Sequence, residues 1–531
     1  MAKEGRYEEA VALIRQNNPF PAVCGAVCNK RCEDRCTRGL VDDPVSIDEV
    51  KKFLTQWELK NPEKFVPICD NMDGKQWTDL PIAVIGSGPA GLSAAYYLRM
   101  DGYPVTVFEK NPVPGGMLTT GLPLFRLERD VINGEIDILR RMGVEFKCGV
   151  EVGKDITIQQ LRDQGFKAFF LGIGLQSGGK LGVPGDSADG VIAGIDFMRK
   201  VSIDPSVKLS GKVVVIGGGN IGADVARTAV RCGAESVDLY CLESYEEMPM
   251  GEEDRSECEA EGIRIHAGWG QTEILTDAGK CAGIKFRKCL SVRNEEGRFA
   301  PTFDDAQTET AECTTVLYCI GQKADWGSLL EGTKVELNPN GTVKADPVTL
   351  QTADPDIFAG GDVYTGQKFV IDAVAGGRVG MVSINRFVHP GQSLTIGRDL
   401  REFIEFNRED ANYGSYDNAG RQKPGFKPGK AAETFSDLRE PLTEEQVKIE
   451  TSRCLKCGAS WVDLNQCVGC GLCTTRCQFD AIHLTRDLPH ASDMHVAEDM
   501  MKVVGPYALK RGIKIIKRAI TGKSDYPTSQ S

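Results

Sequence analysis

A glycine-rich turn after a short apolar segment constrains the fold of this chain more than any other feature. The stretch IAVIGSGPAGLSAA, from residue 82, sets Gly86, Gly88 and Gly91 in the spacing Gly-x-Gly-x-x-Gly, and a helical pattern and the apolar segment PVTVFE follow. In a strand–turn–helix–strand unit the first glycine permits a tight turn, the second lets backbone approach a pyrophosphate, and the third lets the helix pack closely on the strand. Glu109 ends the second segment, where a carboxylate can accept a hydrogen bond from a ribose hydroxyl. The stretch therefore predicts a dinucleotide-binding unit.

A second copy of this pattern begins at residue 213. The stretch VVVIGGGNIGADVAR carries Gly217, Gly219 and Gly222, and a helical pattern and the segment SVDLYCLE follow. Three other stretches fit the same architecture: a Gly/Pro-rich loop at 111–127, a buried strand at 166–174, and an apolar strand at 356–363 that ends in Gly-Gly-Asp. Each alone is also typical of an ordinary α/β domain. Together they predict an α/β protein with two Rossmann-like domains, the arrangement of a flavoprotein that exchanges hydride with a nicotinamide.

Four cysteines at an interval of four residues stand near the start of the chain, in CGAVCNKRCEDRC (24–36). On a single helix the ends of this stretch would lie ~18 Å apart, which is too far for one compact cluster. The chain therefore bends here, or Cys24, Cys28, Cys32 and Cys36 do not all bind the same metal.

Six more cysteines lie between residues 454 and 477, as C-x2-C, nine intervening residues and C-x2-C-x2-C-x3-C. The longer run has the bacterial ferredoxin spacing, in which three thiolates converge on one cluster, although Gln478 replaces the usual proline. A structural zinc site is the alternative, since paired cysteines also bind zinc. We expect one [4Fe–4S] cluster from Cys467, Cys470 and Cys473 plus one more thiolate. Whether Cys454, Cys457 and Cys477 hold a second cluster with a non-cysteine ligand is left open, because six cysteines do not fill two clusters. The other nine cysteines are expected to be small buried hydrophobes.

Composition excludes several classes of protein. The chain has 531 residues and a net charge of −12, whereas nucleic-acid binding usually needs a basic patch. Its apolar runs stay short of the ~20 residues of a membrane span, and the start MAKEGRYEEAVALIRQ lacks the apolar core of a signal peptide. We therefore expect a cytoplasmic protein with no nucleic-acid partner and no integral membrane segment. The basic, amphipathic stretch MMKVVGPYALKRGIKIIKRAITGK could lie on a membrane surface, but we expect it to pack on the protein or on a partner subunit.

Several longer stretches carry a more specific signal: GRYEEAVALIRQNNPFPAVCGAVC, VIGSGPAGLSAA, PGGML, FRL, VIGGGNIGADVAR, EEMP and FAGGDV. Through them, residues 6–395 resemble the small (beta) subunit of glutamate synthase and its relatives. These include the NADPH-binding subunit of the bifurcating ferredoxin:NADP transhydrogenase and the N-terminal half of dihydropyrimidine dehydrogenase. The resemblance implies an FAD-binding domain interrupted by an inserted NAD(P)H-binding domain.

The resemblance also implies which residues contact the cofactors. Those expected to line FAD are Gly86, Gly88, Gly91, Glu109, Gly116, Met117, Leu118, Arg126, Gly361 and Asp362. Those expected to line the nicotinamide cofactor are Gly217, Gly219, Asn220, Ile221 and Gly222. Further candidate cofactor contacts are Pro89, Ala90, Lys110, Ala373 and Gly321.

The segment YCLESYEEMP bears on the choice of nicotinamide. Relatives that use NADPH place two arginines shortly before EEMP, whereas this chain has Leu242 and Glu243 there. Glu243 lies 21 residues after Gly222, at the end of the second strand, where an acidic residue accepts from the 2′-OH of NAD. A 2′-phosphate beside it would be repelled, so the sequence predicts NAD(H) over NADP(H). The alternative is a solvated glutamate, with another basic residue such as Arg255 reaching the phosphate.

The resemblance sharpens the question of residues 24–36. In fuller relatives the equivalent cysteines serve two [4Fe–4S] clusters that also draw on cysteines upstream of a segment like EGRYEEA, with which this chain starts. Lys51 lies where some relatives supply a further ligand, and an ammonium group cannot bind iron. We therefore expect one [4Fe–4S] cluster held by these four cysteines. Zinc, a site completed by another subunit and a relic without metal are the alternatives.

The expected domains follow the chain in order. They are a helical cysteine-rich domain (1–78), the two parts of the FAD domain (79–190 and 324–395) around the NAD(P)H domain (191–323), a linker (396–448), a ferredoxin-like [4Fe–4S] module (449–490) and a C-terminal helix and tail (491–531).

The predicted function is an FAD-dependent oxidoreductase subunit that passes electrons between NADH and iron–sulfur clusters of its own and of a redox partner subunit or ferredoxin. The alternatives are the glutamate synthase small subunit itself and a pure electron-transfer subunit with a vestigial nicotinamide site. No catalytic acid or base is assigned, since the five histidines form no triad-like or HExxH pattern. A disulfide reductase is disfavoured, because no C-x2-C pair lies between residues 37 and 453.

Overall fold

The protein is described here by a computed structural model, which covers residues 1–62, 76–398, 407–410, 415–457, 467–476, 482–485 and 499–521. The chain divides into two compact units. One comprises residues 1–400 and 407–458, and the other comprises residues 401–406 and 459–531. Each unit is described on its own.

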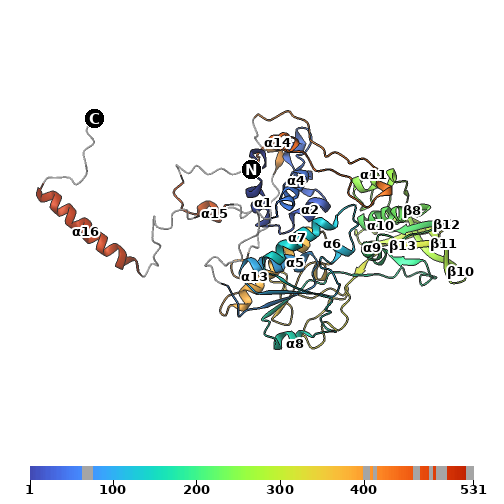
Figure 1. Ribbon diagram of the computed structural model, residues 1–531, viewed down its shortest axis with the longest axis horizontal. Coiled ribbons are helices and arrows are strands. Elements are labelled where there is room, and N and C mark those ends of the chain that lie inside the picture. The colour runs from blue at the N-terminus through green and yellow to red at the C-terminus, as the bar shows by residue number, and fades with distance from the viewer. Residues whose placement is uncertain are drawn as a thin grey trace. The chain divides into compact units, whose positions relative to one another are not determined.

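The first sheet of the larger unit is parallel and carries the first glycine-rich turn. Its strand order is β15-β4-β1-β2-β3. The strands are β1 (Ile82–Ile85), β2 (Val105–Glu109), β3 (Glu145–Cys148), β4 (Ala168–Leu171) and β15 (Ile357–Ala359). The strand β15 joins β4 only after the chain has built the second sheet, so the second sheet is an insertion in the first (Figure 1).

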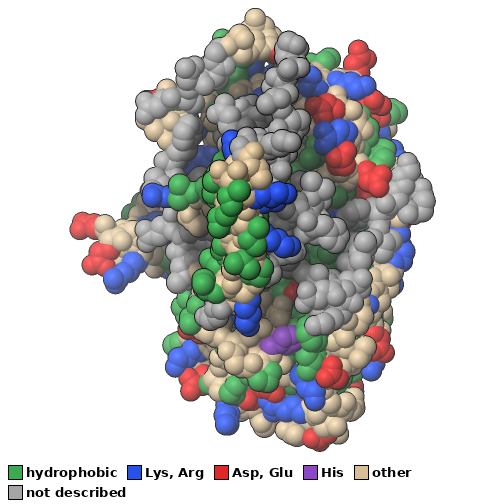
Figure 2. Space-filling view, turned by 90° about the vertical axis from the view of Figure 1, so that its left-hand side faces the viewer, with side chains coloured by type: hydrophobic (Ala, Val, Ile, Leu, Met, Phe, Trp, Pro, Cys, Tyr) green, Lys and Arg blue, Asp and Glu red, His purple; other side chains and the backbone are tan. Residues whose placement is uncertain are grey.

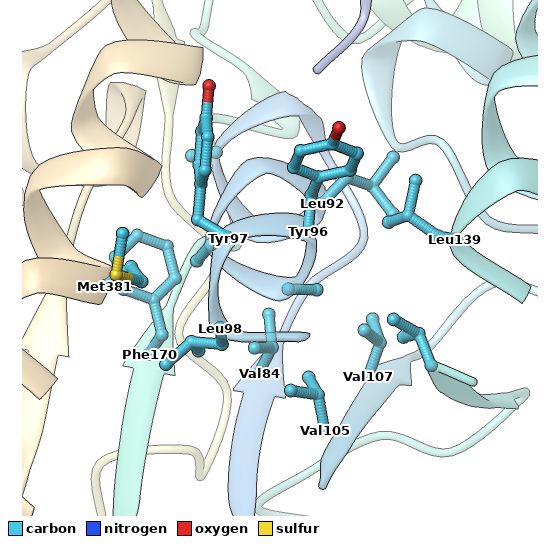
Figure 3. Close-up of a cluster of buried hydrophobic side chains, with 14 of the residues drawn as sticks. Val84, Leu92, Tyr96, Tyr97, Leu98, Val105, Val107, Leu139, Phe170 and Met381 are labelled. Carbon is cyan, nitrogen blue, oxygen red and sulfur yellow. The ribbon is translucent and has the colours of Figure 1, made fainter. Parts of the chain in front are cut away.

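Two helices, α5 (Pro89–Met100) and α13 (Val370–Val388), pack together and against this sheet. Figure 3 shows Leu92 and Leu98 of α5 above Val84 and Val107 of the central strands, with Phe170 of β4 and Met381 of α13 beside them. All six side chains are buried. The packing places the start of α5, and with it the first glycine-rich turn, at the carboxyl end of β1.

The second sheet repeats this arrangement, with the order β6-β13-β7-β8-β9. Its strands are β6 (Val191–Ala193), β7 (Lys212–Ile216), β8 (Ser236–Cys241), β9 (Arg264–Ala267) and β13 (Thr315–Tyr318), and its helices are α9 (Gly194–Ile203), α10 (Asn220–Arg231) and α11 (Glu252–Ala260). An antiparallel sheet lies between β9 and β13 in the chain and consists of β10 (Trp269–Asp277), β11 (Lys280–Arg293) and β12 (Phe299–Ala311). The expected pair of Rossmann-like folds is confirmed, whereas this antiparallel addition was not predicted.

The N-terminal region is helical, as expected, with α1 (Tyr7–Arg15), α2 (Pro21–Val27), α3 (Arg31–Asp34) and α4 (Ile47–Lys60). It is joined to α7 (Arg129–Arg141) of the first domain by a buried ion pair. Nε of Arg15 lies 2.6 Å from Glu58 and its Nη2 lies 2.7 Å from Glu135. Because one guanidinium satisfies two buried carboxylates, this contact fixes the cysteine-bearing helices against the first domain.

Residues 415–457, most of which the sequence analysis placed in a linker, belong to the larger unit and pack on the N-terminal helices. The segment ends in α14 (Glu444–Ser452). The buried carboxylate of Glu450 accepts hydrogen bonds from the backbone N of Ser46 at 2.7 Å and of Gln422 at 2.6 Å, and Arg421 pairs with buried Glu33. The Gly/Pro-rich composition here therefore accompanies a packed segment with little regular structure.

The smaller unit contains α15 (Leu472–Arg476) and α16 (Met500–Thr521) among its described residues. The helix α16, which faces the viewer in Figure 2, exposes hydrophobic side chains beside lysines and arginines. In the parts of the chain that the structure covers, no helix is long and apolar enough to cross a membrane. The remaining short elements are α6 (Met117–Thr120), α8 (Ile158–Asp163), α12 (Asp362–Thr365), β5 (Ser177–Gly178), β14 (Gln322–Lys323) and the 3-10 turns η1 (Ala2–Glu4), η2 (Thr37–Leu40), η4 (Arg408–Asp410) and η5 (Ala431–Glu433).

Candidate dinucleotide cleft and cysteine sites

The first glycine-rich turn has the geometry that its spacing predicts. Gly86 has a φ of +96°, and a Cβ there would lie 2.6 Å from the carbonyl oxygen of Gly172. A Cβ at Gly91 would lie 2.0 Å from the carbonyl oxygen of Gly86, so α5 packs on the turn only without a side chain. At Gly88 the nearest atom is 3.8 Å away. The turn is therefore closed at its first and third glycines and open at the second, where the amide groups at the start of α5 can bind phosphate.

Glu109 is tied to this turn. One of its carboxylate oxygens accepts from the N and the Oγ of Ser87, at 3.0 and 2.5 Å, and the other accepts from the N and the Nδ2 of Asn111, at 2.8 and 2.6 Å. The side chain is buried. These bonds fix the end of β2 against the turn, at the place where a ribose is expected.

The second turn repeats the design. Gly217 has a φ of +133°, and a Cβ at Gly222 would lie 2.0 Å from the carbonyl oxygen of Gly217. A Cβ at Gly219 would meet no atom within 4 Å. The start of α10 is joined to the loop before α11, because Oδ1 of Asn220 accepts a hydrogen bond from the backbone N of Gly251 at 3.0 Å.

Both turns open into one cleft of about 1360 Å³. Every predicted cofactor residue except Gly91 lines it, namely Gly86, Gly88, Pro89, Ala90, Glu109, Lys110, Gly116, Met117, Leu118, Arg126, Gly217, Gly219, Asn220, Ile221, Gly222, Glu243, Gly321, Gly361, Asp362 and Ala373. The exception, Gly91, lies beneath the turn and serves its packing. One continuous cleft with two phosphate-binding turns can place two dinucleotides in contact.

Two charged residues of the cleft, Asp362 and Arg126, lie in unusual environments. Burial raises the pKa of Asp362, at the start of α12, to about 6. Arg126, expected to contact FAD, lines the cleft but forms ion pairs with Asp224 of α10 and Asp254 of α11. Burial also raises the pKa of Asp224, and Arg126 opposes that rise. The guanidinium thus joins the first domain to two helices of the second, a role that the sequence did not reveal because Asp224 and Asp254 lie about 100 and 130 residues away in the chain.

The N-terminal cysteines stand on separate short elements. Cys24 lies within α2, Cys28 follows that helix, Cys32 lies within α3, and Cys36 precedes η2. Lys30, with a left-handed φ of +56°, bends the chain between the helices, so the bend expected from the spacing is present. Burial raises the pKa of Cys24 to about 11. Cys28 lines the dinucleotide cleft.

Lys51 is held away from any ligand role by an ion pair. Its Nζ lies 2.7 Å from a carboxylate oxygen of Asp48. Among the residues that the structure describes, no three His, Cys, Asp or Glu side chains are gathered closely enough to hold a metal ion. The four-cysteine cluster at residues 24–36 therefore stays a prediction.

The C-terminal cysteines fall in both units. Cys454 and Cys457 end the larger unit, whereas Cys467, Cys470 and Cys473 lie in the smaller one. Cys477 lies outside the described residues. The chemistry of these donors fits iron–sulfur clusters, since soft thiolates select them.

Comparison with known families decides the class of the protein. The model of the pyridine nucleotide-disulphide oxidoreductase family matches residues 80–377, which span both sheets and the cleft. The chain belongs to this family. Two further models match outside that region: the 4Fe-4S cluster domain II of dihydropyrimidine dehydrogenase over residues 1–63, and the 4Fe-4S binding domain over residues 460–483.

Curated relatives of this oxidoreductase have related names. The beta subunit of an NADP(+)-dependent formate dehydrogenase from Moorella thermoacetica is 37% identical over 86% of this chain and 68% of its own length. The small chain of glutamate synthase [NADPH] from Escherichia coli K12 is 32% identical over 71% of this chain and 83% of its own length. The PreT subunit of an NAD-dependent dihydropyrimidine dehydrogenase from the same strain is 31% identical over 72% of this chain and 85% of its own length. The resemblance inferred from the sequence is confirmed.

As a member of the pyridine nucleotide-disulphide oxidoreductase family with two 4Fe-4S domains, the protein is an FAD-dependent NAD(P)H oxidoreductase that carries iron–sulfur clusters. When bound, FAD converts between the two-electron chemistry of a nicotinamide and the one-electron chemistry of such clusters. The chain supplies binding and orientation. Both glycine-rich turns are open at their second glycine, where backbone amides could bind phosphates, and Arg126 forms ion pairs with two helices of the second domain.

Proposed function

We propose that this protein is a subunit that takes electrons from NADH, in preference to NADPH, and passes them through FAD to its own clusters and on to a redox partner protein. The observation that carries the proposal is the single cleft lined by both glycine-rich turns and by Cys28, Asn29 and Lys30. A nicotinamide, a flavin and a cluster near Cys28 would share one cavity there. Electron transfer needs such proximity, and no separate acid or base is required of the chain.

Glu243 supports the preference for NADH over NADPH. This residue lines the cleft just beyond β8, and its carbonyl oxygen accepts from the backbone N of Gly268 at 2.8 Å, which fixes the loop. Arg255, the basic residue that could have reached a 2′-phosphate, donates to the carbonyl oxygen of Tyr245 at 2.6 Å and stacks on its ring at 4.5 Å. A 2′-phosphate beside Glu243 would therefore meet a carboxylate, while Arg255 is engaged with Tyr245. The relatives' names include both coenzymes and do not decide this point.

The test is anaerobic stopped-flow reduction of the bound flavin by NADH and by NADPH. We expect at least a tenfold higher kcat/KM for NADH in the wild-type protein, and a shift of at least tenfold toward NADPH in Glu243→Arg, about 1.4 kcal/mol. Glu246→Arg, an exposed charge change three residues away, is the matched control and should leave the ratio unchanged. A tenfold preference of the wild-type protein for NADPH would refute the proposal.

The partner is proposed to be another subunit of a redox complex, with a ferredoxin as the alternative. The relatives support this, because they are named as beta, small or PreT subunits. No disulfide links the described cysteines, which fits the reducing cytoplasm in which we place the protein. Cluster bleaching after NADH addition in the isolated protein would support electron transfer to its own clusters. Flavin that stays oxidised with either coenzyme would instead support a vestigial nicotinamide site, and glutamate formation with a glutamine-dependent large subunit would identify the glutamate synthase alternative.

A further inference from the structure

Cys454 and Cys457 lie in the larger unit, beside the N-terminal cysteines. Sγ of Cys457 is 3.2 Å from Oγ1 of Thr37, the residue directly after Cys36, although 420 residues separate the two in the chain. Cys36 is half-buried, and Cys454 and Cys457 are exposed. A cluster could therefore reach these thiols without opening a packed core.

A buried network fixes this proximity. Arg453, the residue before Cys454, is fully buried and donates to Glu450 at 2.7 Å and to the carbonyl oxygen of Asp43 at 2.6 Å. Its own carbonyl oxygen accepts from Nη1 of buried Arg38 at 3.1 Å. The residue before Cys454 is thus bonded to the second residue after Cys36. Arg453 and its partners therefore have one strongly preferred arrangement, because separating any of these pairs would leave a buried charge without a partner, which is energetically costly.

The C-terminal run does not need these two cysteines. The match to the 4Fe-4S binding domain covers residues 460–483, which contain four cysteines of their own in the ferredoxin spacing. That match begins after Cys457, and so does the longer segment of the smaller unit, residues 459–531. Cys454 and Cys457 lie outside the C-terminal module, and Cys457 contacts the N-terminal domain, whose four cysteines are too few for two clusters.

We propose that Cys36, Cys454 and Cys457 are ligands of one iron–sulfur cluster in the N-terminal domain, so that this site is assembled from both ends of the chain. Three thiolates hold three irons of a cubane. The Cys457 thiol donates to Oγ1 of Thr37, and with Cys457 bound as a thiolate the hydroxyl would donate instead, a contact of the kind that tunes cluster potentials. The inference rests on the iron–sulfur part of the proposed function and is independent of the nicotinamide preference.

The assignment also answers the question raised by the interval of four. Cys24, Cys28 and Cys32 surround the bend at Lys30, and Cys28 faces the dinucleotide cleft. Cys36 precedes η2, whose first residue, Thr37, contacts Cys457. The four cysteines therefore belong to two sites, one beside the flavin and one reached from it, and neither site is complete within residues 24–36.

The test counts clusters in the full-length protein without using a nicotinamide. Iron and acid-labile sulfide per FAD, and the EPR spectrum after dithionite reduction, are measured for Cys36→Ala, for Cys454→Ala/Cys457→Ala and for the triple variant. We expect each variant to lose about four irons and the same EPR signal, and the triple variant to lose no more. Cys467→Ala/Cys470→Ala is the matched control and should lose a different signal. FAD content and the melting temperature report whether each variant folds.

A second measurement needs no variant. Stepwise oxidation of the wild-type clusters with ferricyanide, followed by thiol alkylation and mass spectrometry, shows which cysteines are released together. We expect Cys36, Cys454 and Cys457 to become reactive in one step. The inference is overturned if Cys454 and Cys457 are released with Cys467 and Cys470 while Cys36 is released separately, or if the triple variant loses the sum of the two separate iron losses.

Discussion

The ion pairs of Arg126 predict a specific loss of stability. In Arg126→Gln the two carboxylates of Asp224 and Asp254 stay in place without their cation, and each of these side chains is only 11–12% exposed. Removing one partner of a buried pair costs about 3–5 kcal/mol. Unfolding entropy is about 2.1 cal/mol/K per residue, or roughly 0.95 kcal/mol/K for the larger unit of about 450 residues. The melting temperature should therefore fall by about 3–5 °C.

The dependence on pH separates this cause from a general loss of packing. Without Arg126, burial leaves the folded-state pKa of Asp224 above its unfolded value. The destabilisation is then complete above that raised pKa and is relieved as the pH falls through it, so the deficit of the variant should shrink as the pH is lowered.

Differential scanning fluorimetry of the FAD-loaded protein measures the effect. Arg140→Gln is the matched control, because Arg140 forms an exposed pair with Asp137 worth at most about 1 kcal/mol. Arg126→Gln/Asp224→Asn should recover part of the loss, since one stranded charge is gone. If Arg126→Gln shifts the melting temperature no more than Arg140→Gln does, or if the double variant recovers nothing, Arg126 does not join the two domains in the way described.

Two further predictions concern the cleft. Gly219→Ala should keep the melting temperature within about 1 °C yet weaken NADH binding about tenfold, because a Cβ there meets no protein atom within 4 Å but faces the expected pyrophosphate. Gly222→Ala should lower the melting temperature as well as the NADH affinity, since its Cβ would lie 2.0 Å from the carbonyl oxygen of Gly217. Equal stability of the two variants would contradict this. Burial raises the pKa of Asp362 in the FAD-free folded protein to about 6. This carboxyl group therefore stabilises the fold below its unfolded pKa, and the stabilisation is lost as the pH rises to 6. The wild-type unfolding free energy should therefore fall relative to Asp362→Asn by on the order of 1 kcal/mol between pH 4 and pH 6, and a constant difference would contradict it.

The sequence predicted the parts of the fold whose cause is local. Gly86, Gly91, Gly217 and Gly222 are required by contacts within about ten residues or with an adjacent strand, so their spacing already contains the geometry of the turns. The insertion of one domain in the other was implied by the family resemblance.

The sequence could not predict contacts between segments far apart in the chain. The partners of Arg126 depend on how two domains meet, and no spacing within either fingerprint encodes that. The same holds for residues 415–448, whose polar composition suggested a linker although Arg421 pairs with buried Glu33 and Asp437 pairs with Lys52 of the N-terminal region. A charged residue is exposed by default, and only a partner elsewhere in the chain reverses that expectation.

The bonds between the N-terminal helices and residues 417–453 also set an order of events during synthesis. Arg38, Ser46 and Glu33 each form a hydrogen bond with a segment some 370 to 415 residues later in the chain. At a ribosomal rate of about 5–20 residues per second, these groups wait roughly 20–80 s after they are made. Throughout that interval the cysteine-bearing helices lack these long-range bonds, although local pairs such as Arg38–Asp42 can already form. The N-terminal helices are therefore completed only after residues 417–453 have been made, and until then their cysteines lack the contacts that this segment provides.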